Sequence, residues 1–122
     1  MDDEDFVRNV AGKMLEFLGY ETASARDGEE ALELYRSHRE TGHPFDAVIL
    51  DLSIPNGMGG KEAIGELLRL DPNAKGIVSS GYADQNQEAD FTAQGFAGVI
   101  GKPYELKTLG ETLARVLGVV PT

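Results

Sequence analysis

The sequence contains no cysteine and no apolar run that approaches the roughly 18 residues needed to span a membrane. Without cysteine, disulfides, thiolate metal sites and thiol nucleophiles are excluded, and a reducing compartment is allowed. The first residues, Met1 to Asp5, are acidic and therefore unlike a signal peptide. We therefore expect a soluble, cytoplasmic protein that does not associate with a membrane.

Basic residues are scarce: 11 Lys and Arg stand against 21 Asp and Glu, which gives a formal net charge of -10. Because phosphate backbones are bound through clustered Lys and Arg, direct binding to nucleic acid is not expected. Acidic charge suits solubility, cations or a basic partner. The 122 residues, 41% of them hydrophobic, predict one globular domain that covers residues 1–122.

Apolar spacing divides the chain into alternating helices and strands. Helical spacing predicts helices over residues 6–18, 29–39, 61–70, 85–94 and 106–117. Continuous apolar runs predict buried strands over residues 45–50, 76–80 and 96–101, and a shorter, more polar strand is expected over residues 20–25. This alternation predicts an α/β fold with a doubly wound parallel sheet and helices on both faces.

Polar residues follow three of the predicted strands at the edge where chemistry collects in such folds. They are Asp51, Ser80 and Lys102. A carboxylate directly after four apolar residues is costly to bury unless it is paired or bound to metal. Taken one by one, the others have ordinary explanations: a turn at Ser80, and a surface lysine at Lys102. Asp2 and Asp3 could likewise serve only as helix caps.

As a set, these residues have complementary roles in phosphoryl transfer. Crowded carboxylates repel one another, and an oxygen-liganded cation such as Mg²⁺ relieves the repulsion. One carboxylate can then attack phosphorus while Lys102 and the Ser80 hydroxyl neutralise and hydrogen-bond the transferring oxygens. The product would be an aspartyl phosphate.

Several motifs make the chain resemble the response-regulator receiver family over essentially its whole length. They are Asp2-Asp3-Glu4, Val48-Ile49-Leu50-Asp51-Leu52, Ile54-Pro55, Gly59-Gly60, Ser79-Ser80-Gly81 and Lys102-Pro103. The run from Pro55 to Glu62, together with Ser79-Ser80-Gly81-Tyr82, is similar in particular to receivers at the C-terminal end of hybrid sensor histidine kinases.

The resemblance implies a flavodoxin-like, CheY-like (βα)5 fold with strand order 2-1-3-4-5. It also implies that Asp51 is the phosphoacceptor and that Ser80 and Lys102 hold the phosphoryl group. Mg²⁺ would be bound by Asp3, Asp51 and the Ser53 carbonyl, with Asp2 acting through water. The Lys102-Pro103 bond is expected to be cis.

By the same resemblance, the chain would catalyse only its own phosphorylation and dephosphorylation. A histidine kinase or phosphotransfer protein would supply the phosphoryl group. A downstream protein partner would then bind the face formed by the fourth helix, the last strand and the last helix, because phosphorylation shifts an equilibrium there.

The sequence departs from the family at its start, because receivers have an apolar strand before the acidic pair and only Met1 precedes Asp2 here. The first strand therefore appears as missing or truncated, and Asp2 and Asp3 would lie on a frayed terminus. This departure leaves an alternative open, namely a truncated or degenerate receiver that acts as a non-phosphorylated interaction module. A further departure is Val99, where the family commonly has an aromatic residue.

Two rival classes fit less well. Metal-dependent phosphohydrolases with an aspartyl phosphate need a second Asp two residues after the nucleophile, where this chain has Ser53. A flavodoxin-like cofactor binder needs a phosphate-binding loop rich in Ser, Thr and Gly after its first strand, and the acidic residues 2–5 cannot supply one. No G-x-x-x-x-G-K-[ST] run supports a nucleotide-binding loop.

Overall fold

The structure is a computed structural model that describes the backbone of residues 1–81 and 85–118. Tyr82, part of the motif shared with hybrid kinases, lies outside the described residues. The described elements are α1 (Asp5–Phe17), α2 (Gly28–Glu40), β1 (Val48–Asp51), α3 (Gly60–Leu70), β2 (Gly76–Ser80), α4 (Gln85–Gln94), β3 (Gly98–Gly101) and α5 (Leu106–Leu117). All five predicted helices are confirmed to within one residue at each end, as are three of the four predicted strands to within three residues.

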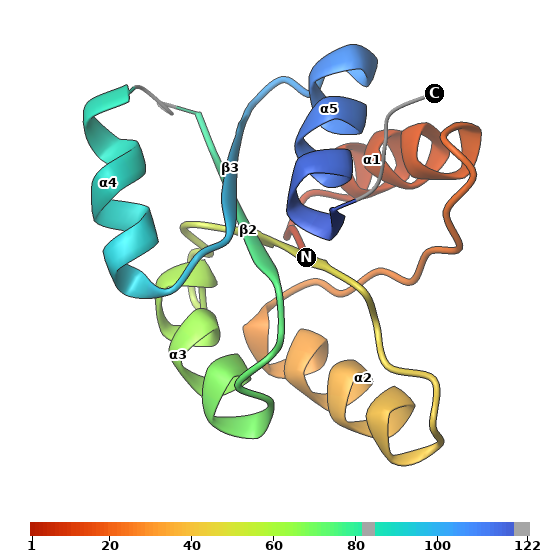
Figure 1. Cartoon of the computed structure of the whole chain (residues 1–122), viewed down its shortest axis with the longest axis vertical. Coiled ribbons are helices and arrows are strands. Elements are labelled where there is room, and N and C mark those ends of the chain that lie inside the picture. Colours follow the sequence, from red (N-terminus) through yellow and green to blue (C-terminus); the bar gives the residue numbers. More distant parts are fainter. Residues whose placement is uncertain (82–84, 119–122) are drawn as a thin grey trace.

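The three described strands form one parallel sheet in the order β1-β2-β3 (Figure 1). Asp51 lies opposite Ser79 in the first pair, and Ser80 lies opposite Gly101 in the second. β2 is buried along its whole length, including its two polar residues, Ser79 and Ser80. Because all strands run in the same direction, their carboxyl ends meet at one edge of the sheet.

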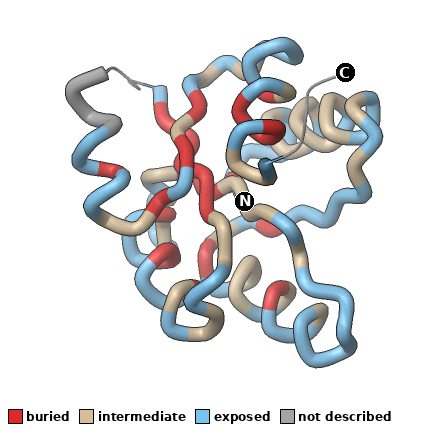
Figure 2. Tube along the Cα trace, viewed as in Figure 1, coloured by how far each residue is buried: buried red, intermediate tan, exposed pale blue. Residues whose placement is uncertain are grey.

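Helices cover both faces of this sheet, as the predicted doubly wound α/β fold requires. On one face, α2, α3 and α4 pack around Leu50 and Val78; on the other, α1 and α5 pack around Ile77 and Ile100. Figure 2 shows the buried residues concentrated along the strands and the inner sides of α3 and α5. Helix α1 has no fully buried residue. None of the described helices has the length and apolar character that a membrane crossing requires.

The strand predicted over residues 20–25 is wrong, because this segment has no regular secondary structure. A strand exists through its ladder of hydrogen bonds to a neighbour. Within the described part of the chain, one backbone hydrogen bond joins the segment to the sheet region, from the Asp2 N–H to the Ala25 carbonyl at 3.1 Å. A single bond does not build a ladder, so among the described residues the sheet has three strands, where the resemblance implies five.

The expectation of a frayed terminus is wrong for Met1 and Asp2. The Met1 ammonium donates to the Ile49 carbonyl at 2.7 Å, and the Asp51 N–H donates to the Met1 carbonyl at 3.0 Å. Asp2 is only 3% exposed. These two residues therefore lie between Ala25 and β1 and are paired with both, whereas Asp3 is exposed.

The start of α2 contacts the loop that follows Asp51. The Asp27 side chain caps this helix by accepting a hydrogen bond from the Glu30 N–H at 2.9 Å. The Gly28 N–H donates to the Met58 carbonyl at 2.8 Å. A Cβ atom on Gly28 would lie 2.8 to 2.9 Å from three Met58 atoms, so the contact requires glycine.

A pair of glycine substitutions tests that contact. Gly28→Ala should destabilise the protein by about 1–3 kcal/mol, because Met58 and its loop would have to move. Gly65→Ala, at a helical position with open space around the new methyl group, should stabilise it by about 0.5–1 kcal/mol. Urea denaturation of both variants measures the difference, and equal effects would contradict the close packing of α2 on the loop.

A second link ties α2 to the end of α3. The Tyr35 hydroxyl donates to Asp71 Oδ2 at 2.7 Å, and Tyr35 is 2% exposed. Burial, followed by the bond to Asp71, raises the pKa of Tyr35 to about 12. The same bond is the main cause that holds the pKa of Asp71 below its ordinary value. The pair therefore stabilises the fold while Asp71 is ionised.

Tyr35→Phe should lower the Tm by a few degrees at pH 7, because it removes this hydrogen bond. Since the pKa of Asp71 is lowered on folding, its contribution is present above about pH 4 and is lost as the pH falls through the folded pKa. The difference in Tm between Tyr35→Phe and the parent protein should therefore become smaller at acidic pH. Tyr20→Phe is the control, as no hydrogen bond of the Tyr20 hydroxyl is recorded in the described part of the chain. A difference in Tm that does not change with pH would contradict the stabilising role assigned to the hydrogen bond between Tyr35 and Asp71.

Candidate functional site

The residues predicted at three strand ends lie together at one edge of the sheet. Asp51 ends β1 and is 8% exposed, Ser80 ends β2 and is 7% exposed, and Lys102 directly follows β3. The Lys102 N–H donates to the Ser80 carbonyl at 3.1 Å, which continues the pairing of β2 and β3 by one residue. The backbone therefore brings a carboxylate, a hydroxyl and an ammonium group to the same end of the sheet.

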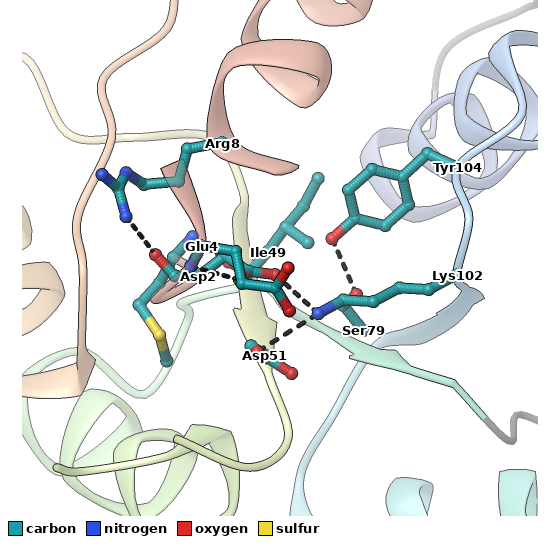
Figure 3. Close-up of polar contacts among 9 residues, drawn as sticks. Asp2, Glu4, Arg8, Ile49, Asp51, Ser79, Lys102 and Tyr104 are labelled. Atoms are coloured by element: carbon teal, nitrogen blue, oxygen red, sulfur yellow. Dashed lines mark hydrogen bonds and ion pairs between the residues drawn. The ribbon is translucent and has the colours of Figure 1, made fainter. Parts of the chain in front are cut away.

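The Lys102 ammonium group bridges two carboxylates from distant parts of the chain (Figure 3). Its Nζ lies 2.6 Å from Asp2 Oδ2 and 3.2 Å from Asp51 Oδ2. Both carboxylates are mostly buried, and a buried carboxylate needs a cationic partner or a proton. Lys102 is thus the cation that neutralises part of this acidic edge.

Burial acts in opposite directions on the pKa values of Lys102 and Asp51. Burial lowers the pKa of Lys102, but its contacts with Asp2 and Asp51 outweigh that effect and raise the pKa above the ordinary value. Burial raises the pKa of Asp51, although Lys102 and a backbone hydrogen bond from Ser53 act in the other direction. Lys102 therefore stays charged, and the carboxylate of Asp51 is held in a site that favours a further positive charge.

Asp2 is fixed by contacts with the start of α1. The Glu4 N–H donates to Asp2 Oδ1 at 3.0 Å, and Arg8 Nη1 donates to the Asp2 carbonyl at 2.7 Å. Arg8 also contacts the Asp5 carboxylate. Figure 3 shows Arg8 on one side of Asp2 and Lys102 on the other. The carboxylate of Asp2 is consequently held in place towards Lys102 and Asp51.

The acidic turn at the start of the chain offers oxygen ligands. Carboxylate oxygens of Asp2, Asp3 and Glu4 all lie within 4.8 Å of one another, with Asp2 buried and the other two exposed. Several carboxylate oxygens at short range match the ligand preference of Mg²⁺ and Ca²⁺. The donor set thus fits a hard divalent cation.

The structure brings two of the predicted site residues together at Lys102, leaves two exposed and buries Ser80. Asp2 and Asp51 meet at Lys102, whereas Asp3 is exposed beside Asp2. Ser53 is exposed, and the contact that the structure gives it with Asp51 is a backbone hydrogen bond. Ser80 is buried at the end of β2. Their roles in metal binding and phosphoryl transfer stay predictions.

Sequence reasoning gave no role to three residues around the site: Arg8, Tyr104 and Glu4, of which only Glu4 was part of a quoted motif. The Tyr104 hydroxyl donates to Ser79 Oγ at 2.7 Å, and burial raises its pKa. The sequence signal that could have identified Tyr104 is its position directly after the Lys102-Pro103 motif. The bond between those two residues is cis, as predicted. Nothing in the sequence distinguishes Arg8 from other helical arginines.

Comparison with known sequences identifies relatives along nearly the whole chain. The profile of the response regulator receiver domain matches residues 1–114. The sensor kinase CckA of Brucella abortus is 34% identical over 117 residues, which are 96% of this chain but only 12% of that protein. The chemotaxis protein CheY of Thermotoga maritima is 33% identical over 117 residues, which are 95% of this chain and 92% of that protein.

Solved structures show the same fold. Vibrio cholerae CheY4 superposes with a TM-score of 0.82 at 29% identity, covering 95% of this chain and 93% of that one. A Burkholderia pseudomallei response regulator with a phosphorylated aspartic acid and a calcium ion superposes with a TM-score of 0.75 at 26% identity. It covers 94% of this chain and 62% of that one. With the profile match over residues 1–114, these likenesses show that the chain belongs to the response regulator receiver domain family of two-component signalling.

Proposed function

We propose that this chain is a phosphoacceptor that receives a phosphoryl group on Asp51 from a histidine kinase or a phosphotransfer protein. The observation that carries the proposal is the placement of Asp51. Its carboxylate is mostly buried at the edge of the sheet, 3.2 Å from the Lys102 ammonium group and beside a second carboxylate, Asp2. A purely structural ion pair needs only one carboxylate.

In the proposed step, a carboxylate oxygen of Asp51 forms a bond to the phosphorus of a phosphohistidine. The bond between phosphorus and the imidazole nitrogen breaks, and its electron pair stays on that nitrogen. Lys102 neutralises charge on the transferring oxygens, and the Ser80 hydroxyl donates a hydrogen bond to one of them. Lys102 already lies within reach of Asp51, so the transfer requires only a short movement of its ammonium group.

Within this proposal, Mg²⁺ would be held by Asp3, Asp51 and the Ser53 carbonyl, with Asp2 assisting through water. When bound, the cation neutralises the carboxylates and the transferring group. Glu4 lies close enough to Asp2 and Asp3 to join them. Asp2 is held by the Glu4 N–H, Arg8 and Lys102, so it keeps its orientation without a direct bond to the metal.

The proposed cycle makes the protein a signalling switch. It would catalyse only its own phosphorylation and dephosphorylation, and its product would be read by a protein that binds α4, β3 and α5. Similarity to CckA supports a hybrid kinase as the setting. The chain spans 12% of that protein, so kinase activity lies outside what this chain could supply.

The second candidate is an interaction module that is not phosphorylated. The absence of a strand over residues 20–25 favours it, because a single backbone hydrogen bond, from the Asp2 N–H to Ala25, joins this segment to the acidic turn in the described part of the chain. Both candidates share the same fold, and they differ in whether Asp51 accepts phosphate.

Incubation with Mg²⁺ and acetyl phosphate separates the two. We expect intact mass spectrometry to show one added phosphoryl group, which Asp51→Asn abolishes because the amide lacks a nucleophilic carboxylate. Asp90→Asn, at an exposed position on α4, should leave the adduct unchanged. Absence of the adduct in the parent protein would eliminate the phosphoacceptor proposal and leave the interaction module.

Lys102→Ala should affect metal binding and phosphoryl transfer in opposite directions. Removing an ammonium group 2.6 and 3.2 Å from two carboxylates should strengthen Mg²⁺ binding, because less positive charge remains at the site. Transfer to Asp51 should slow by roughly tenfold or more, because charge on the transferring oxygens is no longer neutralised.

Calorimetric Mg²⁺ titration and the rate of adduct formation measure the two quantities. Lys107→Ala, at an exposed residue of α5, is the control and should change neither. A fall in both Mg²⁺ affinity and rate, with an unchanged Tm, would contradict the role assigned to Lys102.

A further inference from the structure

Ser79 places a hydroxyl group at a fully buried position of β2. It is 0% exposed, with Asp51 opposite it on one neighbouring strand and Ile100 on the other. Alternate residues of a strand share a face, so Ser79 points to the same face as Ile77, which α1 and α5 cover. A buried hydroxyl needs a hydrogen-bond partner. Ser79 has one in Tyr104, whose hydroxyl donates to Ser79 Oγ at 2.7 Å.

Tyr104 belongs to the short segment that joins β3 to α5. Its side chain packs against the apolar cluster that contains Ile77, Ile100 and Leu109. Burial raises the pKa of its hydroxyl above the ordinary value, so the hydroxyl stays protonated at neutral pH and keeps its capacity to donate. Tyr104 is therefore fixed at two points, by its ring on the apolar cluster and by its hydroxyl on β2.

The same segment carries Lys102, two residues before Tyr104. The segment is joined to two consecutive residues of β2. The Lys102 N–H donates to the Ser80 carbonyl at 3.1 Å, and the Tyr104 hydroxyl donates to Ser79. Figure 3 shows Lys102 extending from this segment towards Asp51, and Tyr104 extending towards Ser79. The two hydrogen bonds together fix the backbone from which the Lys102 side chain begins.

The position of that backbone decides which carboxylates the Lys102 ammonium group can reach. Its Nζ lies 2.6 Å from Asp2 Oδ2 and 3.2 Å from Asp51 Oδ2. Lysine has a flexible four-carbon stem, so its two ion pairs do not by themselves keep the ammonium group close to both carboxylates. If the segment shifted away from β2, the nearer contact with Asp2 would be kept and the longer one with Asp51 lost. The hydrogen bond between Tyr104 and Ser79 opposes such a shift.

We propose that Tyr104 is a positioning residue for phosphoryl transfer to Asp51. Its hydroxyl, held on Ser79, fixes the segment that presents the Lys102 ammonium group to the transferring oxygens. In this role Tyr104 acts through Lys102 and forms no bond to the transferring group. A displacement of about 1 Å in a reacting group can slow a reaction by roughly 100-fold, so a small movement of this segment has a measurable effect. The inference rests on the proposed phosphoacceptor function.

The maximal rate of adduct formation with acetyl phosphate, at saturating Mg²⁺ and well below the Tm, tests the proposal. Tyr104→Phe and Ser79→Ala should each slow this rate by at least about threefold, because each removes the hydrogen bond between the two residues. The variant with both substitutions should regain most of the lost Tm, since two apolar groups replace a bonded pair, while its rate stays low. Tyr20→Phe is the control and should leave the rate unchanged, since Tyr20 packs against the same apolar cluster.

A second comparison shows whether Tyr104 acts through Lys102. In the Lys102→Ala protein, adding Tyr104→Phe should slow the reaction no further, because the group that Tyr104 positions is already gone. Three outcomes would overturn the proposal. They are a Tyr104→Phe rate equal to that of the parent protein, recovery of the rate together with the Tm in the variant with both substitutions, and equal slowing by Tyr104→Phe with and without Lys102.

The parent protein separates this inference from the function on which it rests. If the parent protein forms no adduct, both the phosphoacceptor function and the positioning role are overturned. If the parent protein and Tyr104→Phe form the adduct at the same rate, only the positioning role is overturned, and Asp51 remains the phosphoacceptor.

Discussion

The ion bridge from Lys102 to Asp2 and Asp51 is the interaction on which the site depends. It joins residues that are 100 positions apart in the sequence, and it places two mostly buried carboxylates next to each other. Buried charges are tolerated only when they are paired and hydrogen-bonded. The ammonium group therefore offsets part of the cost of burying two carboxylates next to each other at one edge of the sheet.

The bridge in turn depends on how Asp2 is held. Met1 pairs with β1, the Asp2 N–H bonds to Ala25, and Glu4 and Arg8 bond to Asp2 from the start of α1. Two residues thus connect the sheet, the segment over residues 20–25 and α1. This small number of contacts holds the acidic turn of Asp2, Asp3 and Glu4 at the edge of the sheet, beside Asp51 and Lys102.

Sequence patterns predicted most of the fold, because helical spacing and buried apolar runs are local signals. Asp51, Ser80 and Lys102 were also predictable, since each follows a strand and parallel strands end together. The segment over residues 20–25 was not, because its polar alternation resembles a strand while strand formation depends on a neighbour elsewhere in the chain. The tethering of Asp2 was missed for the same reason, as it rests on contacts with Ala25 and Lys102, which lie far away in the sequence. Tyr104 and Arg8 contribute through tertiary geometry that no short motif encodes.

The central claim is that the carboxylate of Asp51 is the group that accepts phosphate. Tandem mass spectrometry of the protein, after incubation with Mg²⁺ and acetyl phosphate and reduction of the acyl phosphate with borohydride, locates the modified residue directly. We predict a single reduced residue at Asp51. Modification at Asp2 or Asp3 in its place, or at no residue, would contradict this account of the site.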